Sequence, residues 1–70
     1  MDKVKSISLK AARVNAGLAQ KEAAKALGIS TSTLQNYEKG ETVPDILTVR
    51  RIEEIYHYPA DYIFFKKNNA

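Results

Sequence analysis

The sequence contains no cysteine and a single histidine, and no apolar run approaches the roughly 18 residues needed to span a bilayer. Without cysteine the chain has no disulfide and no thiolate ligand for a metal ion. The first residues also lack the apolar stretch of a secretory signal peptide. These absences predict a soluble intracellular protein without a membrane segment or a metal site.

The residues that catalysis needs are also scarce. One histidine and no cysteine leave few nucleophile–base pairs, and the acidic residues are not paired across any predicted concave site. The three glycines, at positions 17, 28 and 40, are too isolated to form a phosphate-binding loop. Seventy residues also leave no room for a ligand-sensing domain. We therefore expect no enzymatic activity, no cofactor and no small-molecule ligand.

Charge is present but unevenly distributed. The net charge is +3, from 11 basic and 8 acidic residues. Residues 1–39 carry seven Lys or Arg and three acids, whereas residues 40–65 carry two and five. This asymmetry is expected of a domain that places one face on a polyanion, although ordinary surface charge gives similar totals.

Glycine and proline divide the chain into pieces of helix length, without the alternation of a strand. We expect a single domain over residues 1–70 with flexible ends at 1–5 and 66–70. The predicted helices are Ser6 to Ala16, Gln20 to Leu27, Thr31 to Glu38, the segment from the Asp45 cap to Tyr56, and Ala60 to Phe65. The expected inward stripe of the fourth helix is Ile46, Val49, Ile52, Ile55 and Tyr56.

The second and third predicted helices form the most informative unit. They are separated by Gly28-Ile29-Ser30, and two helices joined by a short turn containing glycine describe a helix-turn-helix. Gly28 tolerates a left-handed backbone, and Ser30 is a good N-cap. The polar face of the third helix is then left outside on a protruding rod, which fits the major groove of DNA.

The run from Gly17 to Ser30 and the run from Thr33 to Gly40 resemble the phage repressor and Cro-like (XRE) family. The resemblance covers roughly residues 8–64 and rests on Gln20, Gly28, Glu38, Gly40 and Pro44 in order and spacing. It implies an all-α, compact five-helix lambda-repressor-like domain and the cytoplasm of a prokaryotic cell or phage-infected host. The sequence departs from the family at Ala19, which replaces a hydroxyl residue, at Ala23, and at His57, where a helix-ending glycine is usual.

The resemblance also implies roles for individual residues. Base contacts would come from Thr31, Ser32 and Asn36, with Gln35 beside them, and an asparagine side chain suits adenine. Phosphate contacts would come from Gln20, Lys21, Thr33, Lys39 and Thr42. Arg13 and Glu38 would form a partly buried ion pair, the alternative being two unrelated surface charges.

Aromatic residues gather near the C-terminus. The resemblance implies a dimer surface made of Tyr58, Pro59, Tyr62 and Phe65, whereas the alternative is core residues with a few exposed rings. Two copies would place two reading helices about 34–36 Å apart on a near-palindromic operator.

We therefore expect a transcriptional regulator that binds double-stranded DNA at a specific sequence. It would be a repressor of phage or mobile-element type and would act as a homodimer. The main alternative is an antitoxin-type helix-turn-helix protein that binds a toxin partner as well as DNA. RNA binding is less favoured, because the sequence shows no aromatic and basic stacking platform.

Overall fold

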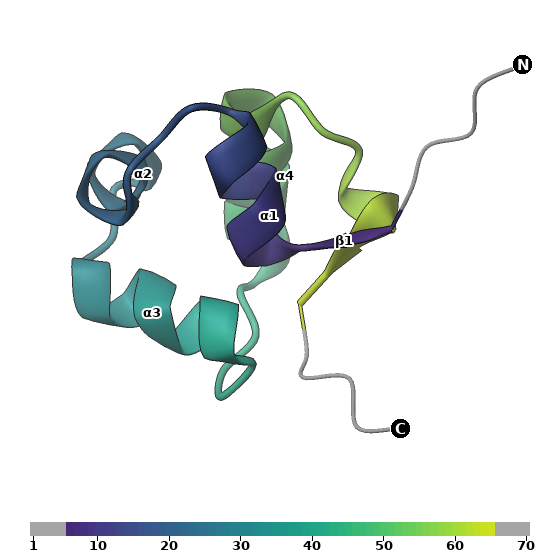
Figure 1. The fold of residues 1–70 in the computed structure, drawn as a ribbon. Coiled ribbons are helices and arrows are strands. Elements are labelled where there is room, and N and C mark those ends of the chain that lie inside the picture. Colours follow the sequence, from purple (N-terminus) through teal and green to yellow (C-terminus); the bar gives the residue numbers. More distant parts are fainter. Residues whose placement is uncertain (1–5, 66–70) are drawn as a thin grey trace, which may run out of the picture.

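The computed structural model describes residues 6–65. The elements are β1 (Ile7–Ser8), α1 (Leu9–Asn15), α2 (Gln20–Leu27), α3 (Thr31–Lys39), α4 (Ile46–Tyr56), the 3-10 helix η1 (Ala60–Tyr62) and β2 (Ile63–Phe64). Figure 1 shows α2 and α3 on one side of the molecule and the two strands on the other, with α1 and α4 between them. The predicted flexible ends, 1–5 and 66–70, lie outside the described residues.

Helices α1, α3 and α4 begin where a side chain accepts a hydrogen bond from one of their first N–H groups. The hydroxyls of Ser8 and Ser30 accept from the backbone of Ala11 and Thr33, each at 3.0 Å. The Asp45 carboxylate accepts from the backbone N–H of Thr48 at 2.9 Å. Hydrogen bonding to Thr48 holds the pKa of Asp45 below its usual value. Ala19, before α2, supplies no acceptor, as the sequence predicts, but its own N–H donates to the Glu22 carboxylate at 2.8 Å.

The core takes one large aliphatic side chain from each of the four α-helices. Leu9, Leu27, Leu34 and Ile52 are the largest fully buried side chains, and each contributes roughly 1.5–3 kcal/mol by leaving water. Alanines at 12, 23 and 24 are also buried and let the helices approach closely.

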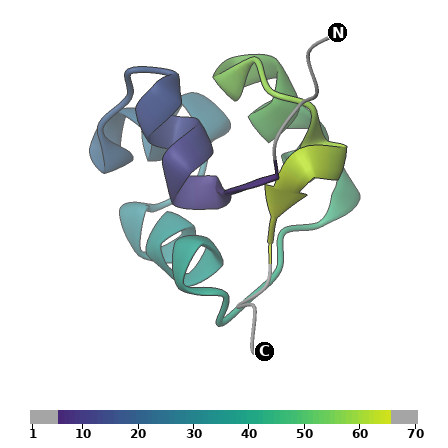
Figure 2. The same ribbon diagram turned by 45° about the vertical axis from the view of Figure 1, so that its right-hand side comes forward.

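The strands correct the expectation of five helices and no strand. β1 pairs with β2 in parallel, with Ile7 opposite Ile63 and Ser8 opposite Phe64. Figure 2 shows the two strands side by side, with β2 following directly after η1. The predicted fifth helix therefore stops after one 3-10 turn, because the backbone beyond Tyr62 pairs with the chain before α1. For the same reason α1 begins at Leu9 rather than Ser6.

The inward stripe predicted for α4 is wrong at its first residue. Ile52 and Tyr56 are buried, but Ile46 is 67% exposed. At 3.6 residues per turn, Ile46 lies about 120° around the helix from Ile52, so both cannot face the same core. Leu47, the next residue, is also exposed. Within residues 6–65, no helix is both long and apolar enough to cross a membrane.

Candidate nucleic-acid interface

The turn between α2 and α3 sets the direction of both helices. Gly28 ends α2 in the left-handed region at φ 73°, and the N–H of Ile29 returns to the carbonyl of Ala24 at 3.0 Å. A side chain at position 28 would strain this conformation. Ala24 and Leu27 of α2 and Leu34 of α3 are almost completely buried. The predicted helix-turn-helix unit is therefore present (Figure 1).

The outer face of α3 carries the four residues predicted to contact bases. Ser32 and Gln35 are exposed, and Thr31 and Asn36 are half-buried. Ser32 and Asn36 lie on the side of the helix opposite Leu34, which has no exposed surface. Among the described residues, the side chains of Thr31, Ser32 and Asn36 make no hydrogen bond. Their donors and acceptors are therefore open to an outside partner.

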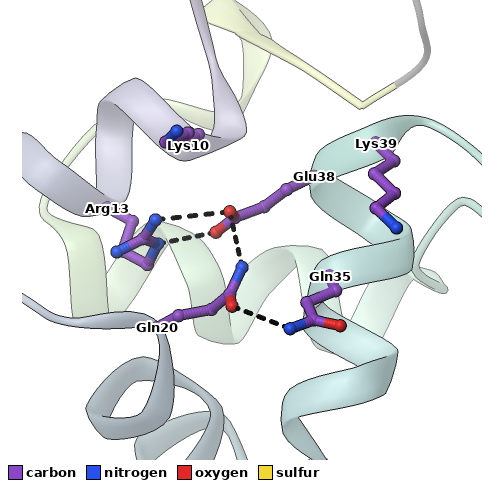
Figure 3. Close-up of a pocket in the computed structure, with 6 residues that line it drawn as sticks. All are labelled: Lys10, Arg13, Gln20, Gln35, Glu38 and Lys39. Atoms are coloured by element: carbon purple, nitrogen blue, oxygen red, sulfur yellow. Dashed lines mark hydrogen bonds and ion pairs between the residues drawn. The ribbon is translucent and has the colours of Figure 1, made fainter.

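A buried polar network anchors α3 to the helices behind it (Figure 3). Arg13 of α1 forms an ion pair with Glu38 of α3, with Nε to Oε2 at 2.7 Å and Nη2 to Oε1 at 3.3 Å. The two side chains are only 9% and 7% exposed, so this is the partly buried pair that the resemblance implies. Arg13 also donates to the carbonyl of Leu18, at 2.9 Å.

Two amide side chains extend this network towards the outer face. The Nε2 of Gln20 donates to Oε1 of Glu38 at 3.0 Å, and the Nε2 of Gln35 donates to Oε1 of Gln20 at 3.2 Å. One chain of hydrogen bonds thus connects α1, α3 and α2 with Gln35 on the outer face of α3 (Figure 3). The sequence did not predict the contact between the two glutamines, because it depends on how α2 and α3 pack.

A buried hydroxyl lies close to the same charges. Tyr56 of α4 is 3% exposed, and its hydroxyl has no hydrogen-bond partner among the described residues. The pKa of Tyr56 is raised to about 12, first by burial and then by the negative charge of Glu38, while the positive charge of Arg13 partly offsets both. The sequence predicted Tyr56 as a core residue but gave no sign that its hydroxyl would be unpaired.

The residues predicted to contact phosphates fall into two groups. Lys21, near the start of α2, and Lys39 and Thr42, at the end of α3 and just beyond, are exposed. Gln20 and Thr33 are half-buried and already bonded within the protein. The hydroxyl of Thr33 lies 2.8 Å from that of Ser30, so it is held at the start of α3.

The sequence did not single out one lysine that lies beside this network. Lys10 of α1 lines the same pocket as Arg13, Gln20 and Lys39 (Figure 3). Its spacing of three residues from Arg13 places both on one side of a helix, and this signal could have identified it from the sequence.

Comparisons with known proteins agree with this geometry. The chain is 41% identical over 58 residues to the HTH-type transcriptional regulator ImmR of Bacillus subtilis (strain 168). It is 45% identical over 51 residues to PH1808 of Pyrococcus horikoshii, which is named as an HTH-type transcriptional regulatory protein.

The match covers most of this chain but only part of either relative. It takes in 83% of the chain and 46% of ImmR, and 73% of the chain and 16% of PH1808. No solved structure matches the chain significantly.

The helix-turn-helix family HTH_3 matches residues 9–63, from the start of α1 to the start of β2. The chain therefore belongs to the helix-turn-helix family, in its XRE-type branch.

Proposed function

We propose that this domain binds double-stranded DNA at a specific sequence and regulates transcription, with α3 lying in the major groove. The observation that carries the proposal is the outer face of α3. It presents unpaired polar groups at Thr31, Ser32 and Asn36 on a helix whose other face is anchored by Leu34 and Glu38. Base edges in the major groove offer donors and acceptors that such groups can match.

Gln35 takes part in the same reading face. Its side chain is exposed and is already oriented by the hydrogen bond to Gln20. A side chain held in place before binding loses less conformational entropy when it meets a base. We therefore place Gln35 beside Asn36 among the base contacts.

The backbone contacts would lie on both sides of the reading helix. Ala19 supplies no side-chain cap to α2, so the backbone N–H groups of Gln20 and Lys21 are open to a phosphate, whereas the N–H of Ala19 is bonded to Glu22. On the other side, Lys39 and Thr42 are exposed. Thr33 is the least favoured of the proposed phosphate contacts, because its hydroxyl is engaged by Ser30.

We propose in addition that the domain acts as a repressor and binds its operator as a dimer. Of the residues assigned to the dimer surface, Pro59 and Tyr62 are exposed, with Tyr62 at 42%. Tyr58 and Phe65 are half-buried and pack against the core, whereas the neighbouring Phe64 is 46% exposed. The exposed part of this surface is therefore centred on Tyr62 and Phe64. No observation on the described residues favours the antitoxin alternative.

Selection of bound duplexes from a random oligonucleotide pool tests the proposal. We expect enrichment of one short sequence in two inverted copies, and sedimentation of the complex should give two chains per duplex. Equal affinity for all duplexes would contradict sequence-specific binding. One chain on a single, non-repeated site would contradict only the dimer.

A further inference from the structure

A polar pocket lies between α1, α2 and α3, beside the reading face. Its volume is about 350 Å³, and it is lined by Lys10, Arg13, Gln20, Gln35, Glu38 and Lys39. Pockets for small organic ligands are lined mostly by apolar and aromatic side chains, with a few polar groups. All six side chains here are charged or carry an amide, so the pocket is better suited to a small hydrophilic anion than to an organic ligand.

The charges around the pocket do not cancel. Arg13 and Glu38 neutralise each other at 2.7 Å, and the amides of Gln20 and Gln35 are bonded within the network. The side chains of Lys10 and Lys39 are both exposed, and neither forms a hydrogen bond or ion pair with any of residues 6–65. Two unpaired positive charges therefore line one pocket, with Lys10 above Arg13 and Lys39 to the right of Glu38 in Figure 3.

We infer that this pocket receives the DNA backbone, and that Lys10 of α1 neutralises a phosphate there alongside Lys39 of α3. This inference rests on the proposed function. Gln35 belongs both to the reading face and to the pocket lining, so a strand whose bases meet α3 would pass the mouth of the pocket. The contact extends the interface to a third helix, α1, outside the helix-turn-helix unit.

The dependence of DNA affinity on salt counts such contacts. Each neutralised phosphate releases counterions, so removing one contact lowers the slope of log affinity against log salt by about one. We expect Lys10→Ala to reduce the slope by about one, and Lys10→Ala with Lys39→Ala to reduce it by about two. Phosphates carry no base identity, so Lys10→Ala should weaken binding to selected and random duplexes by the same factor.

Two further variants serve as controls. Lys10→Arg keeps the charge and should keep the wild-type slope. Lys25 is an exposed lysine of α2 that does not line the pocket, so Lys25→Ala should also leave the slope unchanged. Thermal unfolding verifies that each variant is folded. We expect all of them to fold, because Lys10, Lys25 and Lys39 are exposed.

The outcomes separate this inference from the proposed function. Failure of the wild-type chain to bind any duplex would contradict the proposed function and the inference together. Sequence-specific binding with an unchanged slope for Lys10→Ala would contradict only the Lys10 contact. An equal loss of slope for Lys25→Ala would also overturn it, since the effect would then not depend on the pocket.

Discussion

At the scale of single residues, two buried polar features affect the stability of the centre of the molecule. The first is the ion pair between Arg13 and Glu38, which joins α1 to α3. The second is the hydroxyl of Tyr56, which is buried near that pair without a partner among the described residues. A buried pair is costly to break on one side, whereas an unpaired hydroxyl is inexpensive to remove.

Loss of Arg13 should destabilise the fold strongly. Arg13→Ala leaves the Glu38 carboxylate buried without its counter-charge, and we expect the free energy of unfolding to fall by about 3 kcal/mol. Urea denaturation measures this loss. The matched control is Arg50→Ala, an exposed arginine of α4, whose effect should stay within about 0.5 kcal/mol. Equal effects for the two variants would mean that the ion pair contributes little.

Removal of the Tyr56 hydroxyl should change the response to alkaline pH. The folded pKa of about 12 lies above the ordinary value of 10, so the folded state holds this proton more tightly than the unfolded state does. The resulting stability is fully present below pH 10 and is lost as the pH rises towards 12, by about 1 kcal/mol per pH unit.

Tyr56→Phe tests this directly. At pH 7 we expect its stability to equal or exceed that of the wild type by up to about 1 kcal/mol, because no hydrogen bond is lost. Urea denaturation between pH 9 and pH 12 should show the wild type losing stability relative to Tyr56→Phe. A constant difference across this range would show that the hydroxyl is not buried.

At the scale of elements, the backbone conformation at the helix ends affects the stability of the domain. Both α2 and α3 end at a glycine in the left-handed region, whereas α4 ends at His57 with φ 55°. This backbone conformation destabilises a residue with a Cβ by about 1–2 kcal/mol. Glycine avoids this strain but loses more conformational entropy on folding, which offsets part of the gain.

His57→Gly should therefore stabilise the domain by about 0.5–1 kcal/mol. In a domain of this size the gain corresponds to a rise of several degrees in Tm. The reciprocal variant is Gly40→Ala, at φ 77°, which should lower Tm because it places a Cβ in the same conformation. A lower Tm for His57→Gly would mean that the imidazole makes a stabilising contact that outweighs the backbone strain.

The elements also differ in how far the sequence determined them. The prediction was confirmed for α2 and the turn at Gly28, and α3 starts at Thr31 as expected, because caps, apolar spacing and glycine are local signals. It was wrong for the last element and for the start of the first. A strand of two residues has no periodicity to detect, and β1 finds its partner at the other end of the domain.

The candidate site shows the same division between local and non-local information. The exposure of Ser32 and Gln35 follows from their position around α3 relative to Leu34, and the Arg13–Glu38 pair came from the family resemblance. The hydrogen bonds of Gln20 depend on the packing of three helices, so no spacing along the chain reveals them.

At the scale of the whole molecule, the domain combines a rigid scaffold with an unpaired polar surface. The network through Arg13, Glu38 and Gln20 holds α3 from behind, while the side chain of Asn36 has no hydrogen-bond partner among residues 6–65. The chain spans less than half the length of the relatives it matches, so the scaffold corresponds to one part of those proteins. We expect sequence recognition to reside in the α3 surface and affinity in the surrounding lysines.

Asn36→Ala, measured on the selected operator and on each of its single-base-pair variants, tests this claim most directly. Removal of a base contact should weaken binding to the operator by about 1–3 kcal/mol and abolish the preference at one base pair only. Lys39→Ala is the control, and it should weaken binding to every duplex alike. A uniform loss for Asn36→Ala, with all base preferences intact, would contradict the assignment of α3 as the reading helix.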